Sequence, residues 1–124
     1  MPSDAAKPNP LDGLDRVLHE RARLGIMTQL LAHPDGRVFN DIKTACDLTD
    51  GNLSRHLTTL QDAGLVEIWK GTKDRRPCTL VRLTADGRRR FLDYLTLLEG
   101  IVSNALKAAD GTDRRPGLGF APAG

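Results

Sequence analysis

The sequence predicts a mainly α fold with a small β-hairpin, an α+β architecture. Four stretches carry apolar residues at the spacing of amphipathic helices, and two short runs of β-branched and apolar residues lie between the third and the fourth. With 124 residues, the chain has room for one domain. Hydrophobic residues make up 40% of it and aromatic residues 4%, so we expect a modest, mainly aliphatic core.

Two helices are expected in the first part of the chain. Apolar residues recur at helical spacing from Leu14 to His33, where a Pro-Asp-Gly turn ends the pattern. After a short extended piece, Asn40 is expected to cap a second helix over residues 41–47. Residues 1–12, rich in Pro, Ala and Asp, predict a flexible N-terminal arm. The expected inward-facing residues of the second helix are Ile42, Ala45 and Cys46.

Residues 50–63 predict a third helix with two chemically different sides. Thr49 or Asp50 is expected to cap it, and Gly64 to end it in a left-handed conformation. The stripe expected to be buried consists of Leu53, Leu57 and Leu60. The opposite side carries short hydrogen-bonding groups and one arginine, where a merely soluble surface usually shows several Glu and Lys. These residues are Asn52, Ser54, Arg55, Thr58 and Thr59.

The rest of the chain predicts a hairpin and a long helix. The two strands are expected at residues 65–71 and 78–83. Thr84 is expected to cap a fourth helix over residues 84–106. The Gly- and Pro-rich tail, residues 107–124, is expected to be flexible.

A short second helix, a tight turn and a third helix with a polar outer side make a helix-turn-helix. With the hairpin directly after it, the chain resembles the winged helix-turn-helix transcriptional regulators, and most closely the MarR/ArsR-like group of small bacterial repressors. The resemblance covers about residues 14–106, which gives a domain over residues 13–106. The residues that carry it are Asn52–Leu57, Leu60, Ala63–Val66, Arg75–Pro77, and Leu83–Thr84 leading to Gly87.

The polar side of the third helix fits the major groove of double-stranded DNA. Base edges there present donors and acceptors that Asn, Ser, Thr and Arg match, and the N-terminal part of such a helix reaches the bases. Candidates for base readout are Asn52, Ser54, Arg55 and Thr59. Arg55 is the best candidate for bidentate recognition of a guanine. Thr58 is expected to contact the backbone.

The hairpin segment 70–77 is strongly basic. It carries four cations against the single acidic residue Asp74. A basic hairpin can lie along the DNA backbone and reach into the minor groove, and in similar winged helices the wing has this role. The backbone-contacting candidates are Lys70, Lys73, Arg75 and Arg76.

The fourth helix has an apolar stripe wider than one small domain needs, which predicts a homodimer. Two recognition helices then lie about one DNA turn apart, on an inverted-repeat operator. The alternative is that this helix only completes the core of the monomer. Arg88–Arg90, at its start, are expected either to contact phosphates or to pair with acidic groups such as Glu20. The expected interface residues are Leu95, Leu98, Ile101, Val102 and Ala105.

Other function classes find little support in the sequence. Phosphate-binding glycine loops, G-x-S-x-G and HExxH patterns are absent, so no enzyme is expected. Cys46 and Cys78 form no CxxC pair, and the cysteine pair of ArsR-type metal sensors is missing, so we expect no metal and no cofactor. Without an apolar run long enough to span a bilayer or a signal-like start, the expected location is cytoplasmic, with the nucleoid.

The expected function is therefore a sequence-specific double-stranded DNA-binding transcriptional regulator, acting as a repressor. The alternative is a winged-helix protein–protein interaction module without specific DNA binding. Such a module would expose apolar anchors or acidic groups on the third helix. By analogy with the family alone, an unknown small-molecule effector binds between the dimer helices and the DNA-binding lobes.

Overall fold

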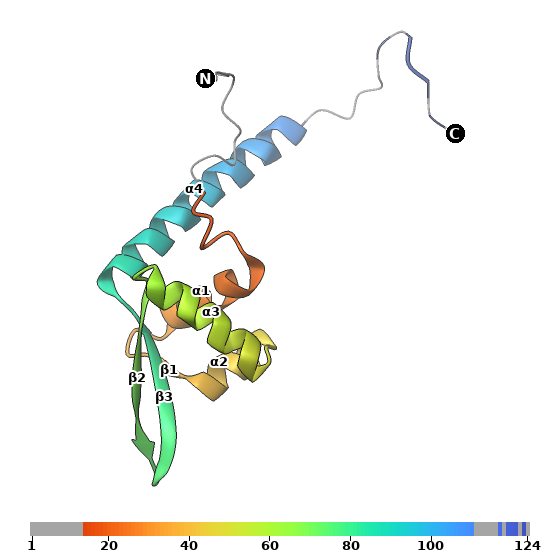
Figure 1. Cartoon of the computed structure of the whole chain (residues 1–124). Coiled ribbons are helices and arrows are strands. Elements are labelled where there is room, and N and C mark those ends of the chain that lie inside the picture. Colours follow the sequence, from red (N-terminus) through yellow and green to blue (C-terminus); the bar gives the residue numbers. More distant parts are fainter. Residues whose placement is uncertain (1–13, 111–116, 118, 122, 124) are drawn as a thin grey trace, which may run out of the picture.

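The computed structural model describes residues 14–110, 117, 119–121 and 123. It contains four helices and a three-stranded antiparallel sheet (Figure 1). This architecture confirms the expected fold class. In chain order the elements are α1 (Arg21–Ala32), β1 (Arg37–Val38), α2 (Phe39–Cys46), α3 (Asp50–Asp62), β2 (Val66–Lys73), β3 (Arg76–Leu83) and α4 (Ala85–Ala109). The expected flexible arm, residues 1–12, lies outside the described residues.

The first helix is shorter than expected, because residues 14–20 form a turn and α1 begins only at Arg21. Glu20 has an extended backbone, and its carboxylate accepts hydrogen bonds from the backbone N–H groups of Ala22 and Arg23, as an N-cap does. Leu18 is nevertheless fully buried. The apolar spacing therefore predicted correctly that Leu18 is buried, but this residue lies in a turn and not in a helix.

Two details of α2 were also predicted wrongly. The N-cap residue is Val38, which makes no capping bond through its side chain, and Asn40 lies inside the helix. Ile42 is buried and Cys46 half-buried, whereas Ala45 is exposed. The helix ends at Cys46, and its C-cap residue Asp47 has a left-handed backbone (φ 54°) that leads into the turn before α3.

The third helix follows the prediction closely. Thr49 is its N-cap and accepts a hydrogen bond from the backbone N–H of Asn52. At the other end Gly64 has φ 76°, and its N–H donates to the carbonyl of Gln61. The N–H of Leu65 donates to the carbonyl of Leu60, which completes a Schellman stop.

The hairpin is longer and tighter than predicted. Strands β2 and β3 pair from Val66–Leu83 out to Lys73–Arg76, so only Asp74 and Arg75 form the turn. Both have positive φ, 53° and 66°, as a type I′ turn requires. The short extended piece β1 adds a third strand on the other side of β3.

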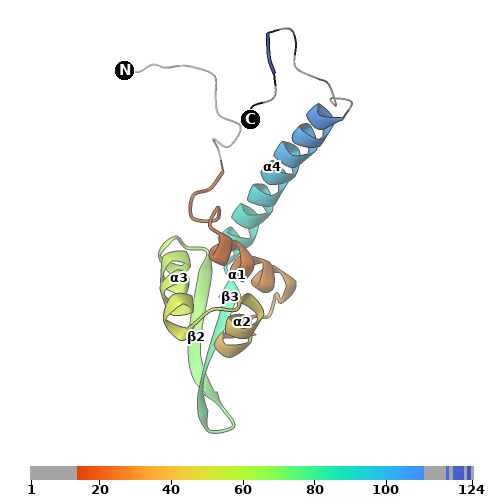
Figure 2. The same ribbon diagram turned by 90° about the vertical axis from the view of Figure 1, so that its right-hand side faces the viewer.

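A single core joins the sheet to all four helices. Leu53, Leu57 and Leu60 of α3 belong to it, which confirms the predicted stripe. From α4, Phe91 and Tyr94 are buried in this core, and Leu95 and Leu98 pack against it. The remainder of α4 runs away from the other elements, at the end of the molecule opposite the hairpin tip (Figures 1 and 2).

The start of α4 passes very close to the start of β2. Thr84 caps α4 as predicted, and its backbone N–H also donates to the carbonyl of Leu65. A Cβ atom at Gly87 would lie 1.9 Å from that carbonyl oxygen, so any side chain there forces the two backbones apart. The helix ends at Ala109, so residues 107–109 of the expected tail are helical.

We expect Gly87→Ala to lower the free energy of unfolding by about 3 kcal/mol, because the backbone of Leu65 cannot give way without disturbing the core. Gly51→Ala is the matched control, since a Cβ at Gly51 meets nothing within 4 Å and alanine favours a helix by about 0.5–1 kcal/mol. Urea unfolding of both variants tests this. If the two variants were equally stable, the close contact at Gly87 would not restrict the side chain at that position.

Candidate nucleic-acid interface

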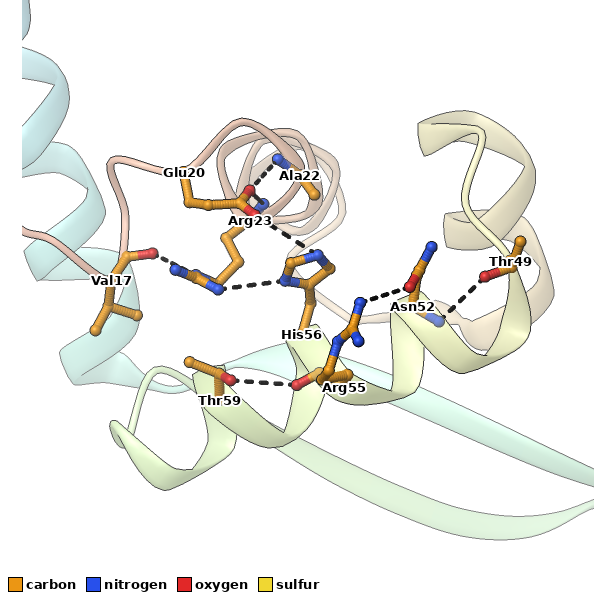
Figure 3. A network of polar contacts seen from close by, with 9 residues as sticks. All are labelled: Val17, Glu20, Ala22, Arg23, Thr49, Asn52, Arg55, His56 and Thr59. Atoms are coloured by element: carbon orange, nitrogen blue, oxygen red, sulfur yellow. Dashed lines mark hydrogen bonds and ion pairs between the residues drawn. The ribbon is translucent and has the colours of Figure 1, made fainter.

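The polar side of α3 is exposed and its side chains are already ordered by one another. Asn52, Ser54, Arg55 and Thr58 are exposed, and Thr59 is half-buried. A nitrogen of the Arg55 guanidinium donates to the Asn52 side-chain oxygen at 2.6 Å (Figure 3). This bond leaves the Asn52 amide donors and the other guanidinium N–H groups directed to solvent. The two residues thus present mainly donors, together with the second lone pair of the Asn52 oxygen, in a fixed relative position.

The two threonines present acceptors instead. The Thr58 hydroxyl donates to the carbonyl of Ser54 at 3.0 Å, and the Thr59 hydroxyl to that of Arg55 at 3.2 Å. Because each hydroxyl proton is engaged, the oxygen lone pairs remain free. A lone pair can accept from a base amino group but not from a phosphate, so the predicted backbone contact of Thr58 requires its hydroxyl to give up this bond.

The acidic residue at the start of α3 is neutralised locally. Asp50 is exposed, and the Lys43 ammonium of α2 lies 2.8 Å from its carboxylate. This ion pair joins the two helices across their turn. It also reduces the repulsion that a bare carboxylate at this end of the helix exerts on a phosphate.

The inner flank of α3 is held by the turn that precedes α1. His56 is half-buried, with its Nε2 atom 3.7 Å from a Glu20 carboxylate oxygen and its Nδ1 atom 3.3 Å from the Arg23 guanidinium (Figure 3). Arg23 also donates to the carbonyl of Val17 at 2.7 Å. Because a guanidinium has donors only, Nδ1 must accept, and the proton of a neutral imidazole sits on Nε2, facing Glu20. These contacts give His56 a structural role, in which it joins α3 to the start of α1.

The carboxylate of Glu20 is stabilised in its charged form. Burial alone raises its pKa, but the hydrogen bonds from the backbone N–H groups of Arg23 and Ala22, together with the electrostatic attraction of His56 and Arg23, hold the pKa below its usual value. Glu20 thus combines the capping of α1 with a contact to α3. Nothing in its local sequence indicated the second role.

The arginine cluster at the start of α4 divides into three different roles. Arg90 donates to the carbonyl of Ala63 at 3.0 Å and to the Asp15 carboxylate at 2.5 Å. Its acidic partner is thus Asp15 rather than the suggested Glu20. Arg89 pairs with Asp86 in its own helix, and Arg88 is exposed. Burial raises the pKa of Asp15, but the hydrogen bond and charge of Arg90 outweigh it and leave the pKa below its usual value.

The hairpin presents its cations freely. Lys70, Lys73, Arg75 and Arg76 are all exposed, and none of the four forms an ion pair within the described part of the chain. Lys73 and Arg76 lie opposite each other at the last pair before the turn. Like charges directly opposite are destabilising in a sheet, so this concentration has a cost that a nearby anion would remove.

An apolar stripe runs along α4, and its first members, Leu95 and Leu98, pack against the core. Leu95, Leu98 and Ile101 are half-exposed, and Ala105 is exposed. Val102 and Leu106 expose 49% and 66% of their surface. Thus the expected dimer residues share one side of a helix that projects from the domain. No helix among the described residues is long and apolar enough to cross a membrane.

Comparison with known proteins agrees with this arrangement. Residues 22–102 match the model of the winged helix DNA-binding domain family, and the chain belongs to that family. A transcriptional regulator homologue from Pyrococcus horikoshii is 33% identical and superimposes with a TM-score of 0.72, over 77% of this chain and 96% of its own. An uncharacterized HTH-type transcriptional regulator of Bacillus subtilis is 30% identical over 77% of this chain.

The fold is shared with further solved structures. The structure of MepR from Staphylococcus aureus in complex with DNA has a TM-score of 0.60 at 24% identity, over 80% of this chain and 78% of that one. The predicted resemblance to winged helix-turn-helix transcriptional regulators is confirmed by the family match and by the P. horikoshii and B. subtilis relatives. The chain spans 62% and 57% of the length of the curated relatives it matches, a Methanocaldococcus jannaschii protein and the Bacillus subtilis regulator.

Proposed function

We propose that this protein is a transcriptional repressor that binds an inverted-repeat operator in double-stranded DNA as a homodimer. The observation that carries the proposal is the exposed side of α3, where ordered donors and free acceptors stand next to a hairpin of unpaired cations. Membership of the winged helix DNA-binding domain family supports it. The P. horikoshii and B. subtilis relatives are described as transcriptional regulators or their homologues.

In this proposal α3 lies in the major groove and reads base edges. The Arg55 guanidinium keeps enough free N–H donors to meet O6 and N7 of a guanine, while Asn52 fixes its position. Ser54 and Thr59 read neighbouring positions. The hairpin cations and Thr58 contact the phosphate backbone on either side.

Two variants of Arg55 distinguish base recognition from the effect of its charge. We expect Arg55→Ala to lose about 10- to 100-fold in affinity for the preferred operator and to lose discrimination at one base position, since a bidentate contact contributes about 1–3 kcal/mol. Arg55→Lys keeps the charge but not the bidentate geometry, so it should lose the same discrimination with less loss of overall affinity. Operator selection followed by titration of single-base variants measures both. Equal weakening of every sequence by Arg55→Ala would contradict base reading.

The hairpin variants test the backbone contacts. We expect Arg75→Gly and Arg76→Ala each to weaken binding to all sequences and to reduce the salt slope, log Kd against log salt, by about 0.9 per lost phosphate contact. Arg75 has φ 66°, so its replacement by glycine relieves backbone strain and should raise hairpin stability. If Arg75→Gly is more stable than wild type but binds DNA less tightly, misfolding is excluded as the cause of the weaker binding.

Asp74→Asn is the matched control for these hairpin variants. It removes a negative charge from the same turn, in a residue that tolerates the φ of 53°. We therefore expect it to strengthen binding. Unchanged salt slopes in all three variants would remove the hairpin from the interface.

The apolar stripe of α4 is proposed to bury itself against a second copy of the chain. We expect Val102→Asp to convert the dimer into a monomer, because it places a charge in the middle of the stripe. Asn104→Asp adds the same charge to an exposed position about 200° further around the helix and should leave the dimer intact. Sedimentation equilibrium distinguishes the two. A wild-type monomer at micromolar concentration would contradict the dimer.

The small-molecule effector stays a prediction. A hollow of about 950 Å³ lies between α1 and α2, with Leu24, Cys46 and Leu48 among its lining residues. Its volume falls within the range of sites for small molecules. It adjoins the turn into α3, so an occupant is well placed to displace the recognition helix.

A further inference from the structure

The attachment of α4 to the rest of the domain lies along residues 84–98. Phe91 and Tyr94 are buried in the core, and Leu95 and Leu98 pack against it. The Tyr94 hydroxyl also lies 2.8 Å from Nδ1 of His19. The C-terminal part of α4 projects away from the other elements (Figures 1 and 2). In the proposed dimer, the partner holds this far part of α4 while α3 enters the DNA. The angle between these helices therefore depends on the contacts of residues 84–98.

One side chain in this region touches both α3 and the N-terminal turn. The Arg90 guanidinium donates to the carbonyl of Ala63, the C-cap residue of α3, and to the carboxylate of Asp15. Asp15 is itself fixed, because its other oxygen accepts a hydrogen bond from the backbone N–H of Val17 at 3.0 Å. The carbonyl at the end of a helix carries partial negative charge, which suits a cation. Arg90 thus joins α4, the end of α3 and the N-terminal turn with three-quarters-buried charges.

We infer that Arg90 is a positioning residue that sets the distance between the two recognition helices and hence the half-site spacing of the operator. This inference rests on the proposed dimeric operator binding. In the proposed complex, Arg90 contacts no base or phosphate. It acts through the angle between α3 and α4.

The lever is long enough for this role. From Arg90 to Val102 the helix rises about 18 Å at 1.5 Å per residue. A tilt of about 10° at Arg90 therefore displaces α3 by about 3 Å relative to the partner, close to the rise of about 3.4 Å per base pair. Small rotations at this joint decide which half-site spacing both recognition helices fit at once.

The other contacts at the joint constrain α4 less specifically. Thr84 donates to the carbonyl of Gly64 at 2.7 Å, but it is the cap residue and lies at the pivot itself. Phe91 and Tyr94 pack in the core, whereas two nitrogens of the Arg90 guanidinium donate to two separate acceptors, the carbonyl of Ala63 and the carboxylate of Asp15. Arg90 is therefore the contact that joins α4 to the C-cap residue of α3 by a directional bond.

The test compares Arg90→Met with Arg89→Met. Both variants remove one arginine charge from the same turn of α4, but Arg89 pairs only with Asp86 in its own helix. Affinities are measured for the selected operator, for versions with one or two base pairs added or removed between half-sites, and for a duplex with a single half-site. For wild type and Arg89→Met we expect a change of one base pair to cost about tenfold. For Arg90→Met we expect less than about threefold, with single half-site affinity within about twofold of wild type.

The outcomes separate the inference from the proposed function. If wild type shows a spacing preference and Arg90→Met keeps it, or loses affinity equally at every spacing, the positioning role is overturned. If wild type selects no spaced repeat, dimeric operator binding fails and the inference falls with it. Should Arg90→Met not fold in a thermal melt, Asp15→Asn carries the same comparison, because it removes the charge partner without creating a cavity.

Discussion

The recognition side chains of α3 are placed by the leucines on the other side of the same helix. Leu53 and Leu60 are fully buried and Leu57 nearly so, and each contributes about 1.5–3 kcal/mol by leaving water. The bond between Arg55 and Asn52 is worth only about 0.5 kcal/mol on an exposed helix surface. Rotating α3 about its axis would expose the leucines at a cost no surface contact offsets. The buried leucines therefore determine which residues of α3 face outward. The polar residues on the exposed side only need to match the surface that they contact.

Packing fixes the rotation of α3, but polar contacts fix its ends and its tilt. The turn over residues 14–20 supplies Glu20 to the middle of the helix and Asp15, through Arg90, to its C-terminus. Both carboxyl groups have a lowered pKa, so their contribution is complete at neutral pH and is lost only as pH falls through the folded pKa values. The domain is thus held in one arrangement throughout the range in which a DNA-binding protein works.

The sequence predicted correctly those features that depend on residues close together in the chain. The leucine stripe, the Thr49 and Thr84 caps and the glycine stop at Gly64 each follow from a few neighbouring residues. The start of α1 was missed because Leu14 and Leu18 bury equally well from a turn. The tight hairpin turn was missed because Asp74-Arg75 lacks the glycine that usually marks positive φ. Asp15 and Arg90 are 75 residues apart, and no spacing rule pairs one acid among many with one base.

Because the net charge is only +2, non-specific attraction to DNA is weak, and affinity depends more on the geometry between the helices. Charges separated by more than about 8 Å are largely screened at physiological salt, so in the proposed complex the cations next to the duplex, those of the hairpin and Arg55, contribute most. A single domain with so few contacts binds DNA weakly, since affinity rises with the number of phosphates neutralised. Two domains joined rigidly gain from the high effective concentration of the second site once the first is bound. In the proposed dimer, that gain requires both recognition helices to fit at once, so the inferred positioning role of Arg90 links affinity to specificity.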